Sequence, residues 1–223
     1  MYNNNYFESN GTQGIGGMKE ERFSIFPRGW WDAAKQEAKP CQRPWQTETI
    51  GWVYNYIKSE RARGATEELR AMPDNATRQQ RQAFKVLNFE YATFSGEFNY
   101  RNAKSLCSRS PYLTLDIDHL GSVDEARELQ RTLVIDTNIE TDLCFVSPSG
   151  NGVKWVVTLP EWTEGMAFRE QYEQVRRYVG FTYGIDPDKS GSDVCRACYL
   201  PYDPQCYVNP KYILKSDKHE KQF

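Results

Sequence analysis

An apolar segment that carries two aspartates places the strongest constraint on this chain. Residues 111–120 include the aromatic and aliphatic side chains of a buried strand, and Asp116 and Asp118 follow two positions apart. Side chains at positions i and i+2 of a strand point to the same face, so the two carboxylates are expected side by side. Neighbouring carboxylates repel unless a cation lies between them, and hard divalent cations prefer carboxylate oxygens. The sequence therefore predicts a Mg²⁺ or Mn²⁺ site at the end of this strand.

The order of the expected elements predicts an α+β fold with helices packed on a mixed or antiparallel sheet. A helical subregion at about 47–87 comes first. Its apolar periodicity indicates helices at about 47–63, 66–72 and 75–87. The sequence after it indicates strands and helices in alternation, at 89–94 (strand), 111–118 (strand), 122–132 (helix), 143–146 (strand), 153–159 (strand), 164–179 (helix), 181–186 (strand) and 194–200 (strand).

Composition sets the boundaries of the folded part. Residues 1–22 are rich in Asn and Gly and are expected to form a disordered tail. Residues 23–210 are expected to form a single domain, and the charged residues 211–223 a fraying C-terminal tail. Such a domain is long enough to bury a substantial core.

Charge and hydropathy exclude several classes of protein. The formal net charge is −2, so binding of phosphate must be local or assisted by metal rather than driven by an overall basic field. We expect no membrane span and no signal peptide, because apolar runs of the required length are missing, and we therefore expect a cytoplasmic protein. Cys195, Cys198 and Cys206 lack the second ligand pair of a zinc site and are interpreted as reduced thiols.

A Gly/Ser loop with a nearby lysine is the second candidate element. Residues 147–152 separate two expected strands and include Ser149, Gly150 and Gly152, and Lys154 follows. Glycines let backbone amides approach an anion closely, and the lysine adds positive charge. The loop lacks the Gly-Lys-Ser/Thr ending of a P-loop. An ordinary hairpin turn with an exposed lysine is the alternative.

Acidic and basic residues near the C-terminal end form the third candidate element. Asp186 ends an apolar run, Asp188 follows two residues later, and Arg196 begins the next expected strand. A guanidinium group can hold a phosphate or pair with a carboxylate, whereas Asp-Pro is also a common start for a turn. Three carboxylates with loop amides, a lysine and an arginine are typical of two-metal phosphoryl or nucleotidyl transfer.

Basic residues also recur at helical spacing in the helix expected at 75–87. Arg78, Arg81 and Lys85 are a solvated helix face in the simplest interpretation. The same spacing makes them a candidate stripe for contacts with nucleic-acid phosphates.

The combined motifs resemble the N-terminal domain of virulence-associated-E-type proteins, a divergent branch of the archaeo-eukaryotic primase superfamily. The resemblance spans roughly residues 23–210 and rests on four segments: 85–98, 115–120, 145–154 and 186–204. It implies a primase-like sheet related to the RNA-recognition-motif fold. It also implies that Asp116 and Asp118 hold metal, with Asp186 as the third acid and Asp188 as the alternative.

The resemblance further implies nucleotide binding by Ser149, Gly150, Gly152, Lys154 and Arg196. Active primases carry a Ser-x-His element here; Ser149 fits the serine, and Lys154 stands where the histidine is expected. Lysine binds phosphate as a point charge but does not act as a neutral donor and acceptor at pH 7. The implied partners are single-stranded DNA, nucleoside triphosphates and a helicase domain or subunit, to which family members are often fused.

Three functions follow from these expectations. The first is a primase-like nucleotidyltransferase of a mobile element or phage, acting in DNA replication and making either RNA or DNA. The alternative is a catalytically inactive module of the same fold that binds single strands during replication initiation. The third is a metal-dependent nuclease that uses the same carboxylates.

Overall fold

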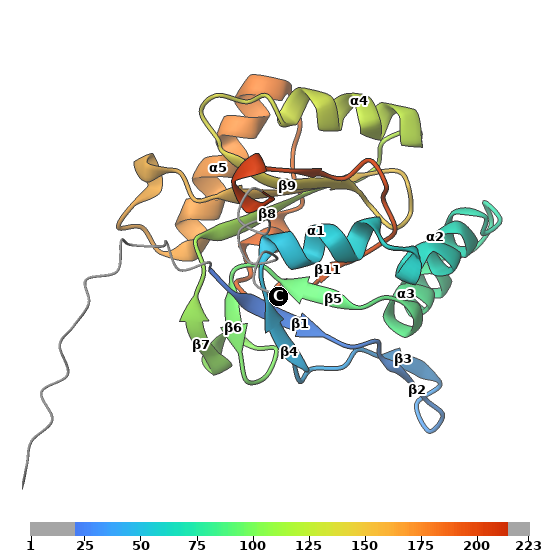
Figure 1. Ribbon diagram of the computed structural model, residues 1–223. Helices are drawn as coiled ribbons and strands as arrows, with labels where there is room; N and C mark the ends of the chain where they lie inside the picture. The colour runs from blue at the N-terminus through green and yellow to red at the C-terminus, as the bar shows by residue number, and fades with distance from the viewer. Residues whose placement is uncertain (1–20, 214–223) are drawn as a thin grey trace, which may run out of the picture.

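Two antiparallel four-stranded sheets form the body of the fold in the computed structural model, which describes residues 21–213 (Figure 1). The N-terminal sheet has the order β11-β5-β1-β4, with strands β1 (Phe23–Phe26), β4 (Gln46–Glu48), β5 (Tyr91–Thr93) and β11 (Cys198–Tyr199). The second sheet has the order β12-β9-β10-β8, with strands β8 (Tyr112–Ile117), β9 (Thr141–Val146), β10 (Val153–Thr158) and β12 (Tyr207–Val208).

Two short hairpins and five helices complete the described part of the chain. The hairpins pair β2 (Trp30–Asp32) with β3 (Glu37–Lys39) and β6 (Gly96–Phe98) with β7 (Leu106–Arg109). The helices are α1 (Ile50–Lys58), α2 (Arg63–Arg70), α3 (Arg78–Asn88), α4 (Val123–Leu133) and α5 (Phe168–Tyr183). The predicted α+β class is confirmed.

The helical subregion differs from the prediction in where its helices begin and end. One helix was expected over 47–63, but α1 ends at Lys58 because Ser59 adopts an extended conformation. The Ser59 side chain then accepts a hydrogen bond from the Arg61 amide and caps a short 3₁₀ turn that leads into α2. Gly64, directly after the expected end of that helix, lies inside α2.

Helix α5 begins and ends four residues later than the helix predicted over 164–179. Helix α5 continues to Tyr183 and ends where Gly184 adopts the left-handed conformation, with φ of 68°. The prediction of a strand over 181–186 is therefore wrong. Within the strand predicted over 194–200, only β11 forms. Ser122 caps α4 by accepting a hydrogen bond from the Glu125 amide, and the Ser-x-x-Glu spacing of residues 122–125 is the sequence pattern of such a cap.

Alternate side chains of β8 pack into two different hydrophobic cores, one on each face of the sheet. Leu113, Leu115 and Ile117 belong to the core beneath α4 and α5, whereas Tyr112 belongs to the core shared with α1 and the N-terminal sheet. Full burial of each large apolar side chain stabilises the fold by about 1.5–3 kcal/mol. Asp116 and Asp118 occupy the positions between and after these leucine and isoleucine residues, so their side chains lie on the opposite face and point away from α4 and α5.

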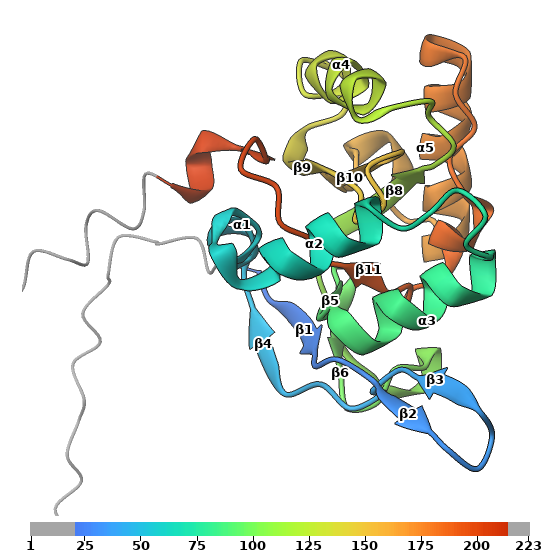
Figure 2. The same cartoon turned by 90° about the vertical axis from the view of Figure 1, so that its right-hand side faces the viewer.

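The layers are visible from the side. Figure 2 shows α4 and α5 over one face of the second sheet, with α1 and α2 on its other side, above the N-terminal sheet. The β2–β3 hairpin extends from the body below α3. Within residues 21–213 the chain forms no helix with the length and hydrophobicity that a membrane crossing requires. The tails predicted at 1–22 and 211–223 lie almost wholly outside the described residues.

Candidate metal and nucleotide site

Asp116 and Asp118 lie at the carboxyl end of β8, on the side of the second sheet that faces away from α4 and α5. The Asp116 side chain is 12% exposed and the Asp118 side chain 41% exposed. The chain turns immediately afterwards, where His119 adopts a left-handed conformation with φ of 68°. The predicted pair of carboxylates at the end of a strand is present.

Asp188 supplies the third carboxylate. One oxygen of each of Asp116, Asp118 and Asp188 lies within 4.8 Å of the other two, which is a spacing that a divalent cation can bridge. The Asp188 amide donates to the Asp116 carbonyl at 2.8 Å, and the Tyr172 hydroxyl donates to the Asp188 carbonyl at 2.5 Å. These backbone contacts fix the loop after α5 against the end of β8.

Asp186, predicted as the third acid, lies outside this cluster. Its side chain is 73% exposed and forms an ion pair with Arg176 of α5. The structure therefore brings the alternative, Asp188, rather than Asp186 to the two aspartates at the end of β8. The physical reason is that residues 185–188 form an irregular loop rather than the expected strand, so the Asp188 backbone bonds to Asp116 and Asp186 faces α5.

Lys154 lies inside the acidic cluster. It is the direct neighbour of Asp116 across the β8–β10 pair, and its Nζ donates a hydrogen bond to Asp116 Oδ1. The same Nζ lies 3.7 Å from Asp118 Oδ1, and the side chain is only 10% exposed. Lys154 is therefore a buried cation between two aspartates, rather than the exposed hairpin lysine of the simpler interpretation.

Arg196 closes the other side of the cluster. One of its guanidinium nitrogens lies 3.1 Å from Asp188 Oδ2 and 3.8 Å from Asp116 Oδ2. The side chain is 41% exposed, so it contacts both the carboxylates and solvent. The predicted pairing of this arginine with a carboxylate is present, and the group remains accessible to an incoming anion.

The surroundings shift the pKa values of these groups in defined directions. Burial raises the pKa of Asp116, and the charge of Asp118 raises it further against the opposing effect of Lys154. Burial alone would lower the pKa of Lys154, but the charges of Asp116 and Asp118 outweigh it and raise the pKa. Lys154 therefore remains protonated at neutral pH.

Asp188 is held in its charged form. Burial opposes this, but hydrogen bonds from the Ser190 hydroxyl and amide and the charges of Arg196 and Lys154 lower the pKa of Asp188. Ser190 was not recognised in the sequence. The Asp-x-Ser spacing is the signal that indicates it, because a carboxylate commonly caps a turn two residues on.

The basic residues predicted on α3 divide into three environments. Lys85 is half-buried near the cluster: burial and the charge of Lys154 lower its pKa, and the charges of Asp118 and Asp116 oppose them. Arg81 donates to the carbonyls of Leu69, Met72 and Pro73 and so holds the end of α2. Arg78 is exposed. Only part of the predicted stripe is therefore available to a ligand.

The Gly/Ser loop lies beside the acidic cluster. A Cβ atom on Gly152 would come within 2.9 Å of Asp118 Oδ1 and 2.6 Å of the Ile117 carbonyl, so only glycine fits. The Gly150 amide donates to the Ser147 carbonyl and is not free for a phosphate, whereas Ser149 is half-exposed. Arg70 of α2, which the sequence did not indicate, donates to the Ser147 and Pro148 carbonyls and anchors the loop.

The cysteines lie in other surroundings. Cys195 donates its thiol hydrogen to Asp193, and burial raises the pKa of Cys195 to about 11. In the described part of the chain, the three aspartates are the group of metal-ligating side chains that lie close enough to share one ion. The interpretation of Cys195, Cys198 and Cys206 as thiols agrees with this arrangement.

The fold and the site together define an α+β domain with an acidic cluster at the end of strand β8, neutralised by the buried Lys154 and the partly exposed Arg196. The family model of the BT4734-like N-terminal domain matches residues 86–208, and the chain belongs to that family. The matched segment contains Asp116, Asp118, Lys154, Asp188 and Arg196. Neither the search of curated proteins nor the search of solved structures finds a match.

Proposed function

We propose that this domain is a primase-like nucleotidyltransferase that adds nucleotides on a single-stranded DNA template. The observation that carries the proposal is the joint placement of three aspartates and two basic side chains in one cluster. Such a set matches the two kinds of charge in a metal–triphosphate complex: carboxylates suit the metal, and Lys154 and Arg196 suit the phosphates.

The donor set fits Mg²⁺ or Mn²⁺. Asp116, Asp118 and Asp188 offer only oxygen ligands, which are the ligands that these ions prefer, and their spacing of at most 4.8 Å suits a shared ion. In two-metal transfer, one ion held by these carboxylates would activate an attacking 3′-hydroxyl and a second would stabilise the pyrophosphate leaving group. Lys154 and Arg196 would orient the triphosphate, and Gly152 keeps the adjoining loop close to Asp118.

The ion pair between Lys154 and Asp116 determines the order of events in this proposal. Without ligand, Lys154 neutralises the two aspartates of β8, so a metal ion alone gains little from them. A triphosphate offers Lys154 and Arg196 a new anionic partner, and the released carboxylates then become available to metal. We therefore expect metal and nucleotide to bind together more tightly than either binds alone.

Template-directed synthesis on single-stranded DNA tests the proposal. The wild type is expected to incorporate labelled nucleotides in the presence of Mn²⁺. The double variant Asp116→Asn with Asp118→Asn is expected to lose at least about 100-fold in incorporation rate, which is the typical effect of removing one group that stabilises charge in the transition state. Asp186→Asn is the matched control, since Asp186 lies outside the cluster. Incorporation that persists in the double variant would contradict the assignment. Ribonucleotides and deoxyribonucleotides are compared to identify the product.

A non-catalytic, single-strand-binding module is the second candidate. The observation that favours it is that Lys154 already takes the place of a cation beside Asp116. A module of this kind would bind single strands equally well in EDTA and would show no incorporation with either Mg²⁺ or Mn²⁺.

Cleavage of single-stranded DNA without added nucleotides would instead support the metal-dependent nuclease. The proposal of a primase-like nucleotidyltransferase also includes a helicase partner and a role in the replication of a mobile element or phage.

A further inference from the structure

The β2–β3 hairpin carries two large aromatic side chains that the fold leaves in solvent. Trp30 is 55% exposed and Trp31 is 49% exposed. Adjacent strand residues point to opposite faces, so the hairpin presents one indole on each side. Burying a tryptophan is strongly favourable, so two adjacent exposed indoles on one strand indicate a binding surface rather than part of the core.

The hairpin is built as a defined structure. Asp32 accepts hydrogen bonds from the amides of Ala34 and Lys35, and Gln36 adopts a left-handed conformation, with φ of 52°, that closes the turn. Glu37 and Lys39 form an ion pair at 2.6 Å. The two indoles are therefore carried on an ordered support, which lowers the entropy that a ligand must overcome.

The hairpin contacts helix α3, whose residue Lys85 lies close to the acidic cluster. The Gly29 amide donates to the Val86 carbonyl of α3 at 2.8 Å, one residue after Lys85. A Cβ atom on Gly29 would come within 2.6 Å of the Val86 side chain, so glycine permits this close approach. Both ribbon views show α3 directly beside the hairpin (Figures 1 and 2). The residue before Trp30 therefore contacts the residue after Lys85.

The charge of this region differs from that of the whole chain. Residues 27–45 and 78–88 contain seven basic and two acidic side chains, whereas the chain as a whole has a net charge of −2. Four of the basic side chains are exposed: Arg28, Lys35, Arg43 and Arg78. Exposed aromatic rings among exposed cations are the features that bind single-stranded nucleic acid, since the rings stack on bases and the cations contact phosphates.

We propose that the β2–β3 hairpin and the adjoining face of α3 bind single-stranded nucleic acid, with Trp30 and Trp31 stacking on its bases. This inference extends the proposed nucleotidyl transfer by assigning the surface that holds the template. The hairpin precedes the segment matched by the family model, so the assignment rests on this chain's own residues. Neither indole contacts the acidic cluster, and binding here requires no metal.

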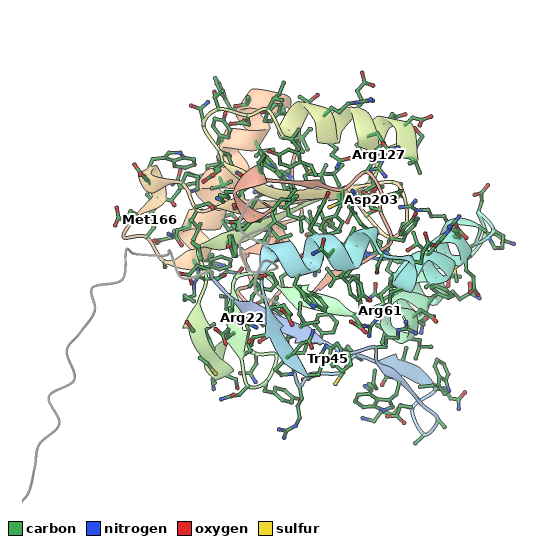
Figure 3. All side chains as sticks on the ribbon, viewed as in Figure 1. Arg22, Trp45, Arg61, Arg127, Met166 and Asp203 are labelled. Atoms are coloured by element: carbon green, nitrogen blue, oxygen red, sulfur yellow. The ribbon has the colours of Figure 1, made fainter. Side chains whose placement is uncertain are left out.

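Fluorescence anisotropy of a labelled 20-nucleotide oligothymidine in EDTA tests the inference. We expect Trp30→Ala with Trp31→Ala to weaken binding at least tenfold, because stacking contributes about 1–3 kcal/mol per base. Trp30→Phe with Trp31→Phe should restore most of the affinity. Trp162→Ala is the matched control, because this tryptophan is 46% exposed but lies in the short 3₁₀ turn before α5, where its ring contacts Tyr178. Met166, four residues further along the chain, lies on the opposite side of the molecule from the hairpin (Figure 3). An oligouridine and a DNA duplex distinguish RNA from DNA and single from double strands.

The outcomes separate this inference from the proposed activity. Asp116→Asn with Asp118→Asn should bind the oligonucleotide like the wild type in EDTA while losing incorporation. Unchanged affinity in the double alanine variant would overturn the hairpin assignment whatever the catalytic result. So would an equal loss in Trp162→Ala, or an absence of wild-type binding, which would assign the indoles to a protein partner. Thermal unfolding of each variant confirms that the fold is retained.

Discussion

Lys154 and Asp116 face each other across the β8–β10 pair, and the Lys154 ammonium donates directly to the Asp116 carboxylate. Both side chains are almost fully buried, so neither charge is hydrated as it would be at the surface. Each charge therefore depends on the other, and a metal ion that binds Asp116 must compete with Lys154.

Replacement of Lys154 by methionine tests this competition. Lys154→Met keeps most of the length of the side chain and removes its charge, which leaves the buried Asp116 with only the more distant Arg196, at 3.8 Å. We expect the free energy of unfolding in EDTA to fall by about 3 kcal/mol and the affinity for Mn²⁺ to rise at least tenfold. Thermal unfolding with and without Mn²⁺ measures both effects. Lys35→Met, at an exposed lysine, is the control; equal responses of the two variants to Mn²⁺ would contradict the competition.

The identity of the third metal ligand gives a second prediction. We expect Asp188→Asn to weaken Mn²⁺ binding in the presence of nucleotide at least tenfold, because the structure places Asp188 within 4.8 Å of the other carboxylates. Asp186→Asn should change the affinity less than twofold, since Asp186 pairs with Arg176. Electron paramagnetic resonance of free Mn²⁺ measures both. The reverse order of effects would restore Asp186 as the ligand.

The buried ion pair between Arg127 and Asp203, which lies outside the acidic cluster, gives a third prediction. Arg127 of α4 donates to both carboxylate oxygens of Asp203, which also accepts from the Val146 amide and is fully buried; Figure 3 shows the two side chains together. Asp203→Asn leaves Arg127 without its anion, so we expect a loss of about 3–5 kcal/mol in denaturant unfolding.

Glu67→Gln provides the control for that experiment. Glu67 pairs with Arg63 on the surface of α2, where both side chains are at least half exposed. Exposed pairs of this kind contribute little to stability, because water and salt screen the two charges. Similar losses in Asp203→Asn and Glu67→Gln would show that the Arg127–Asp203 pair is not a buried anchor.

Asp136 gives a prediction about acid stability. Burial opposes its ionisation, but hydrogen bonds from the hydroxyls of Tyr183 and Tyr178 and the amides of Ile139 and Asn138 outweigh burial and lower the pKa below 3.8. A carboxyl whose pKa falls on folding stabilises the protein above its unfolded pKa, and this contribution is lost as pH falls through the folded pKa. We therefore expect Asp136→Asn to reduce stability at pH 7 by no more than about 1 kcal/mol, because solvent screens this partly exposed carboxylate, and to flatten the decline below pH 4.

The pH dependence of unfolding measures that effect directly. Glu128→Gln on the exposed side of α4 removes one negative charge without removing such hydrogen bonds, and it should leave the acid decline unchanged. An Asp136→Asn protein whose stability falls with acid as steeply as that of the wild type would contradict the role assigned to Asp136.

The strand that carries Asp116 was predictable because its information is local. Alternation of apolar side chains sets the faces of β8, and the i, i+2 rule places both aspartates on one of them. The cap of α4 at Ser122 was predictable for the same reason. The position of Lys154 was not, because the register of β10 against β8 brings together residues 38 positions apart.

The choice between Asp186 and Asp188 was also beyond local reasoning. Both carboxylates follow the same helix, and the family resemblance favoured Asp186, at the end of the strand expected at 181–186. The extension of α5 to Tyr183 removed that strand, and a tertiary hydrogen bond from the Asp188 amide to the Asp116 carbonyl decides the outcome. Likewise, Ser59 ended α1 early through a capping interaction that the apolar periodicity did not indicate.

A crystal structure with Mn²⁺ and a non-hydrolysable nucleoside triphosphate tests the central claim most directly. We predict anomalous density for Mn²⁺ in contact with Asp116, Asp118 and Asp188. We also predict that Lys154 Nζ moves from Asp116 to a triphosphate oxygen. A structure soaked to saturation that shows no manganese at these carboxylates, with Lys154 still bonded to Asp116, would contradict the proposed metal and nucleotide site.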